Sequence, residues 1–84
     1  MTWTKSEIQT ARKIMLMPLL QRRGYRLRPL EHGNHLVENV MGKLVIKENY
    51  WFWNDRKSSG NTIDFFIVIE GLSFRNAMQI LIPK

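Results

Sequence analysis

The sequence contains no cysteine among its 84 residues. The chain can therefore form no disulfide bond, and it cannot bind a metal ion through thiolates. Only two histidines are present, His32 and His35. A structural zinc ion needs four ligands, so we expect no metal. We expect no other cofactor either. We interpret both histidines as ordinary residues of a turn and a strand.

Other absences limit the location and the class of protein. No apolar run is long enough to span a bilayer, and the N-terminus has no signal-peptide pattern, so we expect a cytoplasmic protein without a membrane partner. The carboxylates are scattered, and Ser58 and Ser59 have no histidine close in sequence. A chain of this length forms one domain, residues 1–84, with one modest core. We predict a non-catalytic module, either part of a longer protein or encoded alone.

Acidic residues are few compared with basic ones. There are 7 Asp or Glu against 13 Lys or Arg, which gives a net charge of +6. Residues 1–28 hold seven basic residues and one acidic residue, whereas residues 29–84 hold six of each, so the first third carries the whole excess. A positive excess indicates a polyanionic partner, and the alternative is that the charge only keeps the protein soluble.

The N-terminal part predicts helices over about residues 5–23. Thr4 and Glu7 have the spacing of a capping box, in which each side chain bonds the backbone N–H of the other residue, so the first helix should begin directly after Thr4. Pro18 cannot continue this helix, but it suits the first turn of a second one. Gly24 would end that second helix, because glycine adopts the left-handed conformation found at helix ends.

The segment from about residue 25 to 53 predicts three or four short antiparallel strands separated by turns. Pro29 has no N–H to donate and therefore suits only an edge strand. The last strand is the aromatic run at residues 50–53, YWFW. Strand alternation places Trp51 and Trp53 on one face and the other two aromatic side chains on the opposite face. We expect both faces of this run to be covered.

Helices are predicted again over about residues 62–82. Asn61 follows the polar turn at residues 54–61 and is a suitable N-cap. The next residues, 62–70, are apolar on all sides and indicate a buried helix, although their β-branched content leaves a strand as the alternative. Ser73 should cap the last helix. The whole chain then forms an α+β domain in which a small antiparallel meander is covered by N-terminal and C-terminal helices.

The order of these segments resembles a known family. Gly24-Tyr25, the apolar strand at 44–46, the Gly-Asn-Thr-Ile run at 60–63 and the last helix resemble the CHC-type zinc-ribbon domain at the N-terminus of bacterial DNA primases. More similar still is the cysteine-free relative found ahead of toprim domains in primase-like proteins of conjugative and other mobile elements. In that relative an aromatic W-x-W precedes a Gly-Asn-x-Ile-Asp-Phe run, and residues 51–53 and 60–65 match both.

The sequence departs from the zinc-binding members at the metal ligands. The second pair of family cysteines falls on Trp53 and Arg56, and the first pair falls near residues 34–37, where only His35 has a ligand side chain. The resemblance therefore implies a zinc-ribbon-like fold without zinc, in which Trp53 packs in the space of the metal. The toprim domain, which supplies the catalytic acidic residues in the resembling proteins, is absent from these residues.

Three groups of residues are candidates for binding nucleic acid. A basic N-terminal group has the planar, forked guanidinium groups that suit phosphate, and consists of Arg12, Lys13, Arg22, Arg23, Arg26 and Arg28. A second group precedes a helix start, where free N–H groups favour an anion, and consists of Arg56, Lys57, Ser58, Ser59 and Asn61. Trp51, with its aromatic neighbours, is a candidate for stacking on unpaired bases. The alternatives are a solvated face, a capped turn and an ordinary core residue, respectively.

We therefore expect a metal-free nucleic-acid-binding module, with single-stranded DNA as the preferred ligand, in the replication or transfer of a mobile element. One alternative is a protein-interaction module that docks onto a toprim primase or a helicase through its aromatic face. A further alternative is a non-catalytic fragment of a DNA primase.

Overall fold

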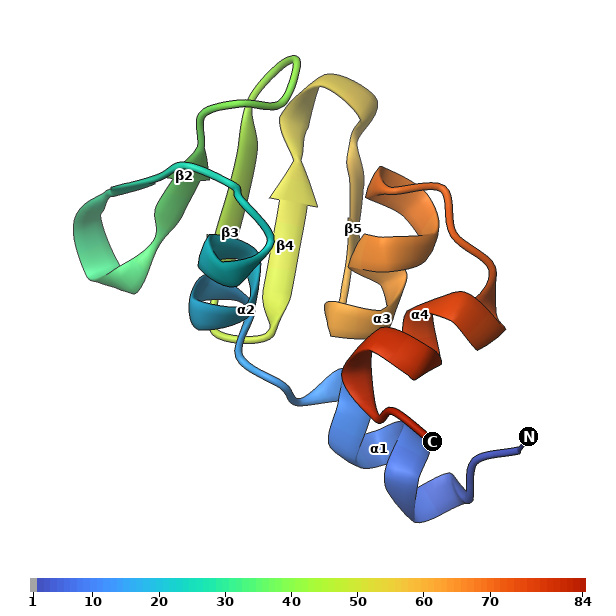
Figure 1. Ribbon diagram of the computed structural model, residues 1–84. Helices are drawn as coiled ribbons and strands as arrows, with labels where there is room; N and C mark the ends of the chain where they lie inside the picture. Colours follow the sequence, from blue (N-terminus) through green and yellow to red (C-terminus); the bar gives the residue numbers. More distant parts are fainter. Residues whose placement is uncertain (1) are drawn as a thin grey trace.

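A five-stranded antiparallel meander forms the centre of the fold, with the strands in sequence order (Figure 1). This computed structural model describes residues 2–84. The strands are β1 (Leu27–Pro29), β2 (His35–Val37), β3 (Leu44–Lys47), β4 (Tyr50–Trp53) and β5 (Ser58–Gly60). Each strand pairs with the next along the chain, so β1 and β5 are the two edges of the sheet. Pro29 lies in an edge strand, as predicted.

The helices come from both ends of the chain. They are α1 (Lys5–Arg12), α2 (Leu16–Arg22), α3 (Thr62–Asp64) and α4 (Phe74–Leu81), and α3 continues as a π-helix over Phe65–Ile69. In Figure 1, α2 crosses one face of the sheet, and α1 and α4 lie together where both chain termini are found. The predicted α+β class, with helices from both termini beside a small antiparallel sheet, is confirmed.

The sheet has one strand more than the three or four predicted. Ser58 to Gly60, which we expected to form part of a turn, pair with β4 as its fifth strand. Strand pairing uses backbone N–H and C=O groups, which small polar residues offer as well as apolar ones. The prediction of a turn was wrong because it used side-chain chemistry alone.

The first helix begins where the capping box predicts. The Glu7 N–H donates to Thr4 Oγ1 at 3.1 Å, and the Thr4 N–H donates to Glu7 Oε1 at 2.9 Å. The Thr4 backbone N–H, together with Lys84, lowers the pKa of Glu7. The second helix begins at Leu16, so Pro18 lies in its first turn as predicted, and the Leu16 N–H donates to the Glu48 carbonyl at 2.9 Å.

The capping box gives a direct test of this helix start. Thr4→Ala removes the oxygen that accepts the Glu7 N–H, and we expect the free energy of unfolding to fall by about 1 kcal/mol. Urea unfolding of both proteins, followed by circular dichroism, measures the difference. Thr2→Ala is the control, because its side chain forms no hydrogen bond within residues 2–84. An unchanged midpoint for Thr4→Ala would contradict this account of the cap.

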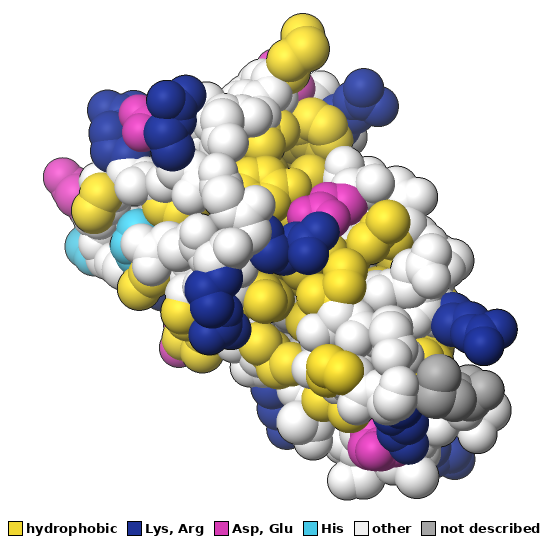
Figure 2. Space-filling view, viewed as in Figure 1, with side chains coloured by type: hydrophobic (Ala, Val, Ile, Leu, Met, Phe, Trp, Pro, Cys, Tyr) yellow, Lys and Arg dark blue, Asp and Glu magenta, His cyan; other side chains and the backbone are white. Residues whose placement is uncertain are grey.

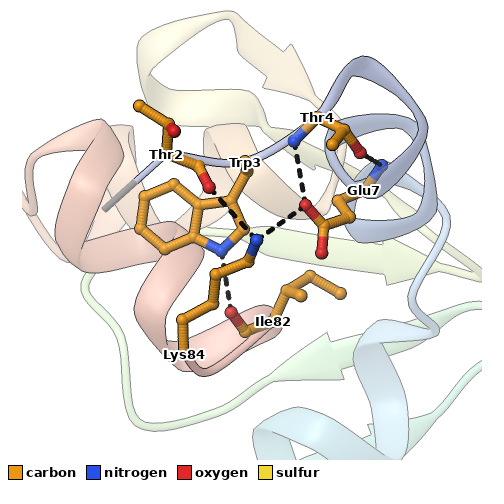
Figure 3. A network of polar contacts seen from close by, with 6 residues as sticks. All are labelled: Thr2, Trp3, Thr4, Glu7, Ile82 and Lys84. Carbon is orange, nitrogen blue, oxygen red and sulfur yellow. Dashed lines mark hydrogen bonds and ion pairs between the residues drawn. The ribbon is translucent and has the colours of Figure 1, made fainter.

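A polar network also holds the two ends of the chain together (Figure 3). The Trp3 indole Nε1 donates to the Ile82 carbonyl at 2.8 Å. The Lys84 ammonium donates to Glu7 Oε1 at 2.9 Å and to the Thr2 carbonyl at 3.1 Å. These bonds connect α1 and the residues before it to the residues that follow α4.

The core lies between the helices and one face of the sheet. Its largest fully buried side chains include Trp51 from β4 and Phe65 and Phe66 from the π-helix. The other helices and strands add further buried apolar residues, among them Leu16 and Leu20 from α2 and Leu44 and Ile46 from β3. No helix within residues 2–84 is both long and apolar enough to cross a membrane.

The C-terminal helices form as predicted, with one difference in their packing. Residues 62–69 are helical, so the strand alternative for this segment is wrong. Ser73 caps α4 by accepting the Asn76 N–H at 3.1 Å. Helical spacing places Phe74 on the same face as the buried Ala77, but Phe74 is 44% exposed. It lies in the first turn of α4, beyond the part of the helix that contacts the core.

Candidate nucleic-acid interface

One face of the sheet is not covered by helices. Strand alternation and the register place seven residues on it, which we call the outer sheet face: Arg28, Leu36, Val45, Lys47, Tyr50, Phe52 and Ser59. Five of them form one row across the five strands, because Arg28 lies opposite Leu36, Leu36 opposite Val45, and so on to Ser59. The predicted cover on both faces of the aromatic run is therefore wrong.

Two aromatic rings stand on this face. Tyr50 is 53% exposed and Phe52 is 41% exposed, and both come from β4. Residues two apart on a strand have their Cα atoms about 7 Å apart along its direction. Leu36 and Val45 beside them are half-buried. The result is an apolar floor with two rings at its surface.

Cationic side chains lie on the same face as these rings. Lys47 lies directly opposite Tyr50 in the register, and Arg28 ends the row that contains Phe52. The Arg28 Nε atom lies 3.7 Å from Glu38 Oε2, but both side chains are exposed, so this ion pair is weak. Lys43 and Lys47 form no ion pair within residues 2–84. Their ammonium groups are free to contact an anion.

A shallow hollow adjoins the outer sheet face. Its lining residues are Leu30, Asn34, Lys43, Val45, Phe52 and Asn54. Val45 and Phe52 are partners across β3 and β4, Lys43 and Asn54 flank these strands, and the other two come from the loop between β1 and β2. Apolar, amide and cationic groups thus meet in one place.

Arg23, a candidate from the basic N-terminal group, contacts other residues of the fold and is not available to a ligand. Its Nη2 lies 2.6 Å from Glu70 Oε1 and its Nε donates to Glu70 Oε2 at 3.1 Å, while its guanidinium lies over the Phe66 ring. The Tyr25 hydroxyl donates to the same carboxylate at 2.9 Å. Burial of the hydroxyl is the larger cause, and this hydrogen bond the second, that raises the pKa of Tyr25 to about 12. Arg23 is therefore not free to bind phosphate.

The other members of the basic N-terminal group are exposed but separate. Arg12 and Lys13 lie at the end of α1, far from the β1–β2 hairpin in Figure 1. Arg22 ends α2, whereas Arg26 directly precedes β1. Of this group, only Arg28 lies on the outer sheet face. The structure therefore does not gather these residues into one cluster.

We predicted an anion site at the start of α3, but the backbone N–H groups there already bond to acceptors of the chain. Asn61 Oδ1 accepts the N–H groups of Ile63 and Asp64, at 2.9 and 3.1 Å, and Asp64 Oδ2 accepts the Asn61 N–H at 3.1 Å. The Phe65 N–H donates to the Asn61 carbonyl. With these N–H groups paired and a carboxylate beside them, the predicted site for phosphate at this helix start is wrong.

The remaining residues of that second group point in different directions. Arg56 lies over the Trp53 ring, 5.1 Å from its centroid, and Lys57 has a left-handed backbone with φ 48°. In β5, alternation places Ser59 on the outer sheet face and Ser58 on the inner one. Only Ser59 of this group belongs to the surface that carries the two exposed rings.

Trp51 is not a surface residue. Its side chain is fully buried, its ring packs edge-to-face on Phe65 at 6.4 Å, and its Nε1 donates to the Asn61 carbonyl at 2.9 Å. The prediction that Trp51 stacks on bases was therefore wrong. Its neighbours Tyr50 and Phe52 hold the exposed position, and the alternation of the run already separated the two pairs.

Metal-ligating side chains do not cluster in the part of the chain that the structure describes, residues 2–84. His35 lies half-buried in β2, opposite Ile46, and His32 lies exposed in the loop before it. The case for a function therefore depends on the geometry and chemistry of the outer sheet face. Comparisons of this chain with protein-family models, with curated proteins and with solved structures found no match.

Proposed function

We propose that this chain is a metal-free, non-catalytic module that binds single-stranded DNA on its outer sheet face. The setting, as the sequence resemblance implies, is the cytoplasmic replication or transfer machinery of a mobile element. The observation that carries the proposal is the pair of exposed rings, Tyr50 and Phe52, on a sheet face without cover. Aromatic rings bind unpaired bases by stacking, and every base offers a face for it.

The dimensions of the sheet favour a single strand over a duplex. Four gaps between five strands make the sheet roughly 19 Å wide, whereas the major groove of B-DNA is only about 12 Å wide. The bases of a duplex also present their edges in the grooves and not their faces. A flat face with two rings therefore suits splayed, unpaired bases. Lys47 beside Tyr50, and Arg28 at the β1 edge of the same face, suit the phosphates.

The test is removal of the two rings. We expect Tyr50→Ala and Phe52→Ala each to weaken binding of a fluorescently labelled oligo-dT by about 1 to 3 kcal/mol, measured by anisotropy. The salt dependence of binding should change little, because neither side chain carries charge. Phe74→Ala is the matched control, since Phe74 is 44% exposed but lies on α4. Unchanged affinity in the Tyr50/Phe52 double variant would refute the proposal.

A second candidate is a module that docks onto a protein, for which the resemblance suggests a toprim primase or a helicase. The observation that favours it is Met41, whose side chain is 89% exposed. The Trp53 Nε1 donates to its carbonyl at 3.0 Å, so the backbone that presents this side chain is fixed. Figure 2 also shows hydrophobic side chains along the face that carries the helices. In this case Met41→Ser would abolish docking and leave DNA affinity unchanged.

A further inference from the structure

The hollow beside the outer sheet face has a lining that suits a single planar ring. Val45 and Phe52 form its floor, and Leu30 adds an apolar side chain from the β1–β2 loop. The Leu30 N–H donates to the Asn34 carbonyl at 2.8 Å, which fixes this loop beside the sheet. A flat apolar floor that includes an exposed aromatic ring provides a stacking surface for a nucleobase.

Three polar side chains around this floor have unused hydrogen-bonding capacity. The side-chain amide of Asn54 forms no hydrogen bond within residues 2–84. The Lys43 ammonium has no ion-pair partner in the same residues. Asn34 Nδ2 donates to the Glu31 carbonyl at 2.8 Å, which orients the amide and leaves Oδ1 as an acceptor. The Asn54 N–H donates to the Lys43 carbonyl at 3.0 Å, so these two residues are held side by side.

The combination of donor and acceptors distinguishes between the four bases. Guanine has two acceptors, O6 and N7, on one edge, and donor groups N1–H and N2–H₂ on the next edge. The Lys43 ammonium can only donate, so it suits O6 and N7, whereas asparagine oxygens suit the N1–H and N2–H₂ donors. Adenine and cytosine carry an amino donor in the place of O6, where it would face the ammonium. Thymine offers the O4 acceptor and the N3–H donor, but it has a second acceptor, O2, where guanine has the N2–H₂ donor.

We propose that this hollow binds one unpaired guanine of the single strand, stacked on Phe52, with Lys43 donating to O6 and N7. The Asn34 and Asn54 amide oxygens accept the guanine N1–H and N2–H₂ groups. This inference rests on the proposed function, because it assigns a base to one position on the same face. It makes binding selective at that position, with guanine ahead of thymine and both ahead of adenine and cytosine.

The experiment compares four oligonucleotides by anisotropy: oligo-dT, and oligo-dT with one central dG, dA or dC. We expect the dG oligonucleotide to bind about tenfold more tightly than the dA and dC ones. Lys43→Met and Asn54→Leu should each remove most of this preference. Lys47→Met is the matched control, because it removes a cation from the outer sheet face outside the hollow, so it should weaken all four oligonucleotides equally and preserve their order.

The outcomes separate this inference from the proposed function. If no oligonucleotide binds, both fail together. If all four bind equally, if another base is preferred, or if Lys43→Met and Asn54→Leu leave the preference unchanged, the guanine site is refuted while single-strand binding stands. Guanine preference that disappears in the two hollow variants and persists in Lys47→Met supports the site.

Discussion

Replacing Trp51 with alanine is expected to lower the free energy of unfolding by about 3 to 5 kcal/mol, as is typical for removing a large buried aromatic side chain. Its ring is fully buried and packs on Phe65, so alanine would leave a cavity in the centre of the core. The change also removes the donor for the Asn61 carbonyl. A domain of this size is commonly stable by only about 4 to 13 kcal/mol, so a large share of its stability would be lost.

Urea unfolding followed by circular dichroism measures this effect, and Phe52→Ala is the internal control. Phe52 is the next residue on the same strand, but its ring is on the outer sheet face and 41% exposed. Its removal should change the unfolding midpoint far less than the removal of Trp51. If both substitutions cost the same free energy, the assignment of inner and outer faces to β4 is wrong.

The sequence predicts this alternation but not which pair of aromatic residues is buried. The pattern YWFW separates Trp51 and Trp53 from Tyr50 and Phe52 whatever the fold. The choice of face depends on which side the helices pack, and that is decided by contacts with residues distant in the sequence, such as Leu16 and Phe65. Period-two alternation contains no information about those contacts.

The sequence predicts structure correctly where the hydrogen bonds join residues that are close in the sequence. The capping box at Thr4 and the N-caps at Asn61 and Ser73 involve hydrogen bonds over two or three residues, and all three form as predicted. The same local bonds explain why the predicted anion site is wrong. A well-capped helix start has few N–H groups left for a ligand, so a strong capping signal argues against an anion site at the same place.

The candidate site could be predicted only in part. Arg23 looks like a phosphate ligand in sequence, but its partner Glu70 is 47 residues away, so the pairing is not visible before folding. Neither Lys43 nor Lys47 lies in a dense basic run, so the charge pattern of the sequence does not indicate them as ligand contacts. The sheet register brings Lys47 opposite Tyr50, and it sets Lys43 and Asn54 at the ends of adjacent strands. The pairing of strands, rather than the density of charge along the chain, brings the residues of the candidate interface together.

The charges of the outer sheet face are expected to control affinity. We predict that the double variant Arg28→Gln and Lys47→Gln will bind oligo-dT roughly 60-fold more weakly at 50 mM salt, if each residue neutralises one phosphate. The slope of log affinity against log salt should become shallower by about 1.4, because each phosphate contact contributes roughly 0.7 for a single strand. Anisotropy titrations across a salt series measure both quantities.

The matched control removes the same amount of charge elsewhere. Arg12→Gln and Arg22→Gln neutralise two exposed residues on α1 and α2, away from the outer sheet face. Neither double variant should lose much stability, because exposed charges contribute little to it. If net charge alone attracts DNA, both variants will weaken binding equally, and the outer sheet face is not the interface. A large loss of affinity and slope in the first variant, with a small loss in the second, locates the phosphate contacts beside Tyr50 and Phe52.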